Sequence, residues 1–255
     1  LYIKFLGFES YAIISFTLII AGVMAVLDAG LTATLSREFA RNDQSIEDKR
    51  RIFNTLETSY FLIIIIVSIM IFFFSNSIAN NWLNLNTISP NRVSLFIKII
   101  GFEAGFQMLF RFYMGGVLGF EKQVKANIFQ IGWGILRNGL VVFAIFYVQT
   151  LEMFFIWQLF ATIIFTLIMR LLLLSILNGN HNFSFKPTLE KEIFLKIWHF
   201  AGGMLLISLV AALNTQMDKL AISKLLDIDN LGYYTLAVSL SMGILVLVSP
   251  ISVAL

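Results

Sequence analysis

Seven long apolar runs dominate the chain, separated by short stretches that hold most of its charges. Each run has about twenty residues, the length that a helix needs to cross the hydrocarbon core of a bilayer. The runs are unbroken, whereas the strands of a membrane barrel would show short segments of alternating hydrophobicity. The pattern predicts an all-α, polytopic membrane helical bundle with about seven spans, at residues 12–35, 59–79, 93–118, 128–148, 153–177, 199–222 and 233–255.

The composition favours a membrane protein over a soluble one. Of the 255 residues, 58% are hydrophobic and 13% are charged, whereas soluble domains have about a quarter charged residues. Cationic loops beside a membrane explain the net charge of +3, so we expect no nucleic acid partner. The absence of cysteine excludes disulfides and thiolate metal sites.

Basic residues are unevenly divided between the two sides of the predicted bundle. Three of them, Lys4, Arg92 and Lys224, fall in the loops of one side. Ten fall in the other set of loops, which the positive-inside rule assigns to the cytoplasm. Leu1 then faces outward, which suggests that a preceding span is missing and that the chain is a fragment of a longer transporter-like protein. The ten cytoplasmic residues are Arg37, Arg41, Lys49, Arg50, Arg51, Lys122, Lys125, Lys186, Lys191 and Lys196.

Two segments of the chain resemble one another at a constant offset of 220 residues. Residues 1–18 align with residues 221–238, so that Lys4 matches Lys224 and Leu6 matches Leu226. In both copies a short acidic outer loop leads into a long apolar span. Parallel repeats of this kind are common in secondary transporters, although chance similarity between two apolar segments is the alternative.

Charged side chains inside the third span form one polar stripe. Glu103, Gln107 and Arg111 are spaced four residues apart, so they share a helix face. A charge in mid-membrane costs on the order of 3 kcal/mol and therefore needs a partner, a cavity or a function. The stripe is interpreted either as a network within the helix or as the wall of a water-filled cavity, in which Arg111 binds an anion.

The fourth span carries a second polar set at helical spacing. It comprises Gln130 and Arg137, with Asn138 beside them. Arg137 lies about ten residues, or roughly 15 Å, from the cytoplasmic start of the span. That depth is too great for easy snorkelling, so a position facing a cavity is favoured.

Other ionisable residues leave two interpretations open. Asp28 lies within two turns of the cytoplasmic end of the first span and is either solvated at the interface or functional. Asp218 and Lys219, near the end of the sixth span, pair locally or with another helix. Arg170 is predicted to mark the cytoplasmic end of the fifth span. In the third span the GxxxG spacing of Gly101 and Gly105 permits close helix approach.

Enzyme signatures are missing from the sequence, which has no Walker loop, no H-E-x-x-H and no G-x-S-x-G. His181 and His199 flank a predicted cytoplasmic linker and are interpreted as solvated residues rather than metal ligands. We therefore expect no enzymatic activity, no metal site and no cofactor.

Three segments, taken in order, resemble one family. FLGFESYAIISF with LDAGLTATLSREFAR, GVLGFEKQVKANIFQ, and NTQMDKLAISKLLDIDNLGYYTLAVSL are similar to segments of polysaccharide (O-antigen) flippases. These proteins belong to the multidrug/oligosaccharidyl-lipid/polysaccharide exporter superfamily. The seven spans would correspond to the second to eighth of the usual twelve or fourteen.

The resemblance implies two helical lobes that alternate access to a central cavity. Residues 1–178 would form the amino-terminal lobe, 179–198 a cytoplasmic linker, and 199–255 the start of the second lobe. The implied cargo is an undecaprenyl-pyrophosphate-linked oligosaccharide, moved to the outer leaflet of the bacterial inner membrane. Other polysaccharide-assembly membrane proteins are possible partners beside the bilayer.

That cargo suggests roles for the buried polar residues. Guanidinium groups offer bidentate hydrogen bonds to a pyrophosphate. Arg111 and Arg137 are the candidates, with Gln107, Gln130 and Asn138 in the same cavity. A coupling proton or sodium ion, or a charge network, is assigned to the remaining set, which is Asp28, Glu103, Asp218 and Lys219.

Two other functions fit parts of the pattern. A multidrug or cation antiporter of the same superfamily would want carboxylates rather than two buried arginines in its cavity. A membrane enzyme of glycan assembly would change the covalent structure of its substrate, whereas a flippase changes only the leaflet. A scaffold protein without transport activity would have no functional use for the charges deep in its spans, although their burial costs free energy.

Overall fold

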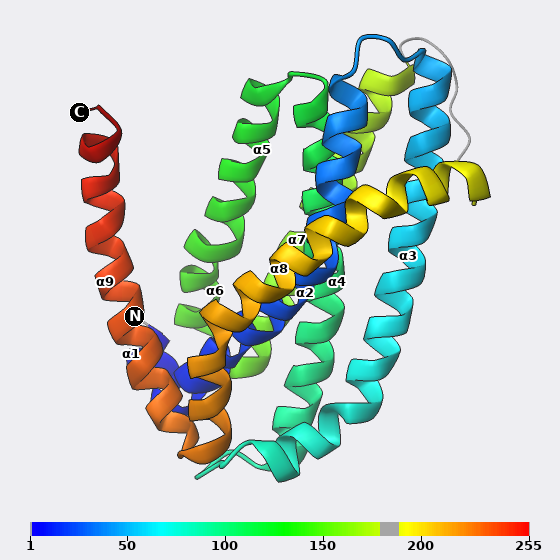
Figure 1. Cartoon of the computed structure of the whole chain (residues 1–255). Helices are drawn as coiled ribbons and strands as arrows, with labels where there is room; N and C mark the ends of the chain where they lie inside the picture. The colour runs from blue at the N-terminus through cyan, green and yellow to red at the C-terminus, as the bar shows by residue number, and fades with distance from the viewer. Residues whose placement is uncertain (1, 179–188, 255) are drawn as a thin grey trace.

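The computed structural model of the chain describes residues 2–178 and 189–254, apart from the side chains of residues 25, 27, 29, 178, 196–201 and 244–254. Over these residues the chain is a bundle of helices without β-strands (Figure 1). The elements are α1 (Tyr2–Leu6), α2 (Phe8–Ala40), α3 (Ile46–Ser77), η1 (Ile78–Trp82), α4 (Pro90–Gly119), α5 (Gln123–Gly134), η2 (Ile135–Gly139), α6 (Val141–Tyr147), α7 (Leu151–Asn178), α8 (Lys191–Leu225) and α9 (Ile228–Ala254), where η denotes a π-helix.

Five helical segments of the described chain are long and apolar enough to cross a membrane, and they match five of the seven predicted spans. They are Ile46–Trp82, Pro90–Gly119, Gln123–Tyr147, Leu151–Leu177 and Gly202–Leu225. The first predicted span lies within α2, and the last lies within α9 up to residue 254, where the described residues end. Phe8–Met24 of α2 forms a shorter apolar segment. The prediction of an all-α polytopic membrane bundle is therefore confirmed.

The helical chain is interrupted before each of two long helices, at Gly7 before α2 and at residues 226–227 before α9. The opening stretch forms the short helix α1, which ends at Leu6 and is followed by Gly7 with a φ of 85°. Glycine adopts this left-handed conformation without steric cost. The second break precedes α9, and the start of α2 at Phe8 and that of α9 at Ile228 lie 220 residues apart, the offset of the internal alignment.

Helix α4 is the most buried of the five spanning segments and packs against α2, α3 and α7. A Cβ atom at Gly101 or Gly105 would lie 2.5 Å from Ile71 or 2.7 Å from Ile64, both on α3. The predicted close approach at this glycine pair is thus confirmed, because the side chains of Ile71 and Ile64 on α3 fill the space that side chains at these two positions of α4 would occupy.

Helices α2 and α8 run diagonally to the other long helices, with α8 in front, and α9 diverges from them toward its carboxyl end (Figure 1). α8 begins at Lys191, inside the predicted linker 179–198, and residues 179–188 lie outside the described residues. His181 falls in that undescribed stretch, and the side chain of His199 is also undescribed. The division into two lobes stays a prediction.

Hydrogen bonds from backbone and side-chain groups hold the helix ends together on the side assigned as outer. The Ile228 N–H donates to the Asn84 carbonyl at 3.0 Å, and the Asn86 amide donates to the Asp229 carboxylate at 3.2 Å. The buried Glu9 carboxylate accepts the N–H groups of Thr87 at 2.9 Å and Ile88 at 3.2 Å. The α3–α4 loop is thereby fastened to both helix breaks.

Candidate functional site

A polar cavity of about 180 Å³ lies where α1, α2, α4, η2, α7 and α9 meet. Its wall combines two charged residues with amides, hydroxyls and aromatic rings. The lining residues are Tyr2, Tyr11, Ile14, Ser15, Thr17, Leu18, Glu103, Arg137, Asn138, Phe154, Phe155, Gln158, Thr235 and Ser239. Residues from both predicted lobes therefore contribute to one site.

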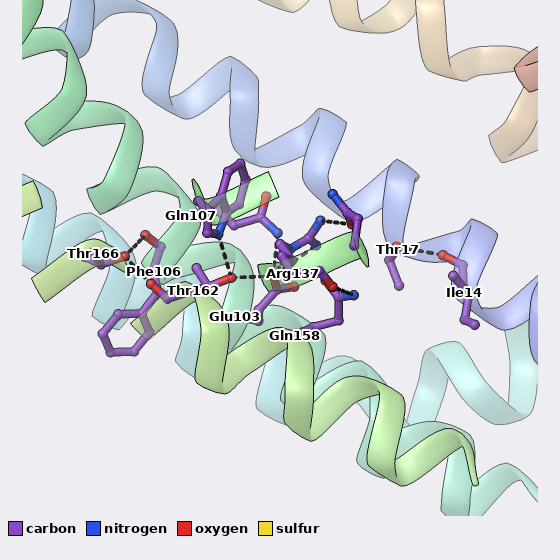
Figure 2. Close-up of polar contacts among 11 residues, drawn as sticks. Ile14, Thr17, Glu103, Phe106, Gln107, Arg137, Gln158, Thr162 and Thr166 are labelled. Atoms are coloured by element: carbon purple, nitrogen blue, oxygen red, sulfur yellow. Dashed lines mark hydrogen bonds and ion pairs between the residues drawn. The ribbon is translucent and has the colours of Figure 1, made fainter. Parts of the chain in front are cut away.

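Arg137 and Glu103 form an ion pair at the centre of this site (Figure 2). Nη2 and Nε of Arg137 lie 3.0 Å and 3.1 Å from Oε1 of Glu103. The same oxygen accepts from Gln107 at 2.6 Å and from Thr162 at 3.1 Å. One oxygen of the carboxylate thus accepts from donors on α4, η2 and α7, which compensates for the burial of the charge.

The π-helical segment η2 places Arg137 and Asn138 toward the cavity. Its wider turn leaves backbone carbonyls without their usual helical partners. Side chains of α7 satisfy these carbonyls: Trp157 donates to Leu136 at 2.9 Å, and Gln158 donates to Arg137 at 2.9 Å. Irregular backbone in a membrane segment is tolerated when protein covers it in this way.

Two buried polar atoms of the cavity wall lack hydrogen-bond partners among the described residues. These are Oε1 of Gln158 and Oγ1 of Thr235, and both side chains are 3% exposed. A buried polar group without a partner typically costs about 1–3 kcal/mol. The unsatisfied pair points to a polar molecule as the natural occupant of the cavity.

A second buried cluster surrounds Asp28 on α2. Its carboxylate accepts hydrogen bonds from the hydroxyl groups of Thr32 and Tyr60, and Arg111 is near enough to act on its charge. The Asp28 side chain is only 7% exposed, so the interpretation that interfacial water solvates it is wrong. Hydroxyl groups from α2 and α3 replace that water.

A third cluster was not predicted. Glu57, which is fully buried on α3, accepts from Tyr113 at 2.7 Å and from Arg170 at 2.8 Å. Glu57 lies two residues before the predicted span 59–79, so it does not count among the charges inside the predicted spans. Arg170 is predicted only to mark a helix end. An arginine in the apolar α7 run was the available signal, since such a charge needs a partner.

Of the other predicted site residues, the structure keeps Asn138 beside Arg137 and places Arg111, Gln130 and Asp218 elsewhere. Arg111 belongs to the Asp28 cluster and does not line the polar cavity. Gln130 is exposed on α5. Asn138 accepts from Arg137 at 3.3 Å. Asp218 is exposed on α8, where it accepts from the hydroxyl of Tyr234.

The remaining predicted residue, Lys219, bonds locally to Gln216 at 3.3 Å. Arg111 and Arg137 therefore do not converge on one anion site in this arrangement. Within the part of the chain that the structure describes, no cluster of His, Asp or Glu side chains could hold a metal ion.

Comparisons with known proteins indicate a single family. A family model described as polysaccharide biosynthesis protein matches residues 1–255. A putative O-antigen transporter of Shigella flexneri is 21% identical over 232 residues, which are 90% of this chain and 54% of the relative. The chain thus spans about half the length of the curated relative it matches. No solved structure matches the chain.

Proposed function

The chain belongs to the polysaccharide biosynthesis protein family, and we propose that the whole protein moves a lipid-linked oligosaccharide from the cytoplasmic to the outer leaflet. Its apolar helices and its family place it in the bacterial inner membrane as a multi-pass protein. The name of the Shigella relative supports transport rather than a chemical reaction. An undecaprenyl-pyrophosphate carrier is the proposed lipid.

The observation that carries the proposal is the chemistry of the polar cavity. Sugars present many hydroxyl groups and apolar ring faces, and they are recognised by amides, hydroxyls and aromatic side chains. The cavity supplies the unsatisfied Gln158 and Thr235, the hydroxyl-bearing Ser15 and Ser239, and the ring of Tyr11. A volume of about 180 Å³ is below the range of drug-sized pockets, so we propose that it holds one sugar unit at a time.

Arg137 is the proposed partner of the pyrophosphate. Its guanidinium can form two parallel hydrogen bonds to phosphate oxygens, and its side chain is 20% exposed to the cavity. Glu103 neutralises it in the present arrangement, so a pyrophosphate has to compete with that carboxylate. We propose that the exchange of Glu103 for the pyrophosphate on Arg137 is part of substrate loading.

Asp28 is the proposed site of the coupling proton or sodium ion. Within the described residues it forms no salt bridge, whereas Glu103 and Glu57 are both paired with arginine. Asp218 is exposed and lies outside the buried clusters. The three oxygens contributed by Asp28, Thr32 and Tyr60 could hold either ion.

Complementation tests the proposal. The full-length protein is expressed in a strain that lacks its flippase, and the lipid-linked glycan is measured in each leaflet. We expect unmodified glycan to move to the outer leaflet, and Arg137→Ala to abolish the movement when transport is normalised to the amount of protein in the membrane. Arg92→Ala is the matched control, because Arg92 also pairs with a glutamate, Glu152, but is 59% exposed outside the cavity.

Other outcomes identify other functions. An unchanged leaflet distribution with lowered drug accumulation would replace the flippase by a multidrug antiporter. A glycan of altered covalent structure would indicate an enzyme of glycan assembly. Retained glycan export in the Arg111→Ala/Arg137→Ala double variant would refute the anion-binding role of the arginines.

A further inference from the structure

An apolar groove of about 810 Å³ lies on the face of α2 opposite the polar cavity. On α2 the cavity is lined by Tyr11 and Leu18, and the groove by Ile20 and Val23. These pairs point to different sides of the helix at 100° per residue. α3 forms the second wall of the groove, where Phe74 is 57% exposed.

Polar groups stand at only one end of the groove, on the side assigned as outer. Lys224 of α8 lies 5.5 Å from the ring centre of Trp82 and donates to the carbonyl of Asn81. Trp82 donates in turn to Ser223 at 3.1 Å. The π-helical segment η1 carries both Asn81 and Trp82, so the groove ends in a fixed pairing of α8 with η1.

The charge at this end has no acidic counterpart. Lys224 forms no ion pair within residues 2–178 and 189–254. A lysine beside a tryptophan is typical of the boundary between hydrocarbon and headgroups. A long apolar wall that ends in such a pair has the shape and charge of a site for a lipid whose headgroup is anionic.

We propose that the groove binds one acyl chain of an anionic phospholipid, with the lipid phosphate on Lys224. The occupant is a membrane phospholipid rather than the carried glycolipid, because α2 separates the groove from the polar cavity. A molecule whose sugar occupies that cavity cannot place its chain in the groove through the helix. The bound lipid joins α3 and η1 to α8 and so stabilises the outer contacts.

Lipid binding to the purified full-length protein tests this assignment. Native mass spectrometry in detergent is used to titrate phosphatidylglycerol against phosphatidylcholine. One lysine near an anionic lipid gives an expected preference of about fivefold for phosphatidylglycerol. Lys224→Gln should remove the preference. Lys98→Gln is the matched control and should keep it, since Lys98 lies 4.6 Å from the ring centre of Phe72 but does not line the groove.

Fluorescence locates the lipid independently of that variant. Phosphatidylglycerol brominated near its glycerol end should quench the emission component that is lost in Trp82→Phe. Val23→Phe, which fills the groove, should weaken that quenching. Equal binding of both lipids by the wild type, an unchanged preference in Lys224→Gln, or an unquenched Trp82 would overturn the proposal. Displacement of the brominated lipid by undecaprenyl phosphate would also overturn it, and would assign the groove to the carrier lipid.

Discussion

Arg137 and Glu103 form an ion pair of 3.0 Å that joins η2 to α4 inside the polar cavity. The Glu103 side chain is 6% exposed, so its charge depends on this partner. The pair makes the cavity nearly neutral, so another anion can bind the guanidinium of Arg137 only by displacing the Glu103 carboxylate. The side chain that pairs with Glu103 is therefore also the one that we propose for pyrophosphate binding.

The two charges of this pair should be energetically coupled. Arg137→Gln alone leaves Glu103 charged and buried, and breaking a buried pair costs about 3–5 kcal/mol. Glu103→Gln/Arg137→Gln should cost clearly less than the sum of the two single variants, because neither charge then remains. Unfolding of the purified variants in detergent measures the double-mutant cycle. Additive losses would show that the pair is not coupled.

Glu57 should be the carboxylate whose loss harms the fold most. Glu57→Gln removes the negative charge that balances Arg170 at 2.8 Å and weakens the acceptor for Tyr113. We expect a loss of about 3 kcal/mol or more in the free energy of unfolding. Glu47→Gln, on the exposed first turn of the same helix, should change it by less than about 0.5 kcal/mol. Equal melting temperatures for the two variants would contradict this prediction.

Gly119 should not tolerate a side chain. A Cβ atom there would lie 2.6 Å from the Ser36 carbonyl oxygen, and that backbone cannot move aside cheaply. Gly119→Ala should destabilise by about 1–3 kcal/mol through overpacking of α4 against α2. At Gly203, none of the described atoms lies within 4 Å of an added Cβ, and the alanine should be neutral or stabilising by up to about 1 kcal/mol. Thermal unfolding in detergent compares the two substitutions.

Asp28 should be required for coupling but not for folding. Asp28→Asn keeps the size of the side chain and removes the ionisable group, so substrate binding should survive while gradient-driven transport is lost. Asp43→Asn, at an exposed loop carboxylate, serves as the control. Transport into vesicles with an imposed proton or sodium gradient distinguishes the two ions. Full gradient dependence in Asp28→Asn would exclude Asp28 as the coupling site.

The contact between the start of α3 and the segment before α8 should depend on pH and salt. A hydrogen bond from Arg51 lowers the pKa of the Glu190 carboxyl. A carboxyl with a lowered pKa keeps its contact above the ordinary glutamate range and loses it as the pH falls through the lowered value. Both side chains are partly exposed, so about 1 M salt should also weaken the pair.

Spin labels at residues 47 and 195 report this contact, and labels at residues 91 and 230 report the outer one. The first distance distribution should broaden in acid, in high salt and, at neutral pH, in Glu190→Gln. The second should not respond to salt, because backbone hydrogen bonds such as Ile228 to Asn84 hold the outer end. Broadening of both distances together would indicate general loosening of the bundle instead.

The apolar runs by themselves determined the class of the fold, because the bilayer admits only structures that satisfy every backbone group internally. The GxxxG pair of Gly101 and Gly105 likewise predicted close helix approach, since the missing side chains define a local surface. Arg137 was identified from its depth in an apolar run. The apolar runs, the glycine pair and the depth of Arg137 can each be predicted from the sequence, because each depends only on one segment and on the solvent around it.

The partners of the buried charges were decided only by the tertiary structure. Glu103 meets Arg137 across 34 residues, and Glu57 meets Arg170 across 113. No periodicity within a helix records which face of another helix it will meet. The π-helical segment η2, whose wider turn changes the direction of the Arg137 side chain, also cannot be predicted from the pattern of apolar residues. Helix packing sets these pairings because burial forces each charge to find its donor or acceptor in whichever helix lies nearest.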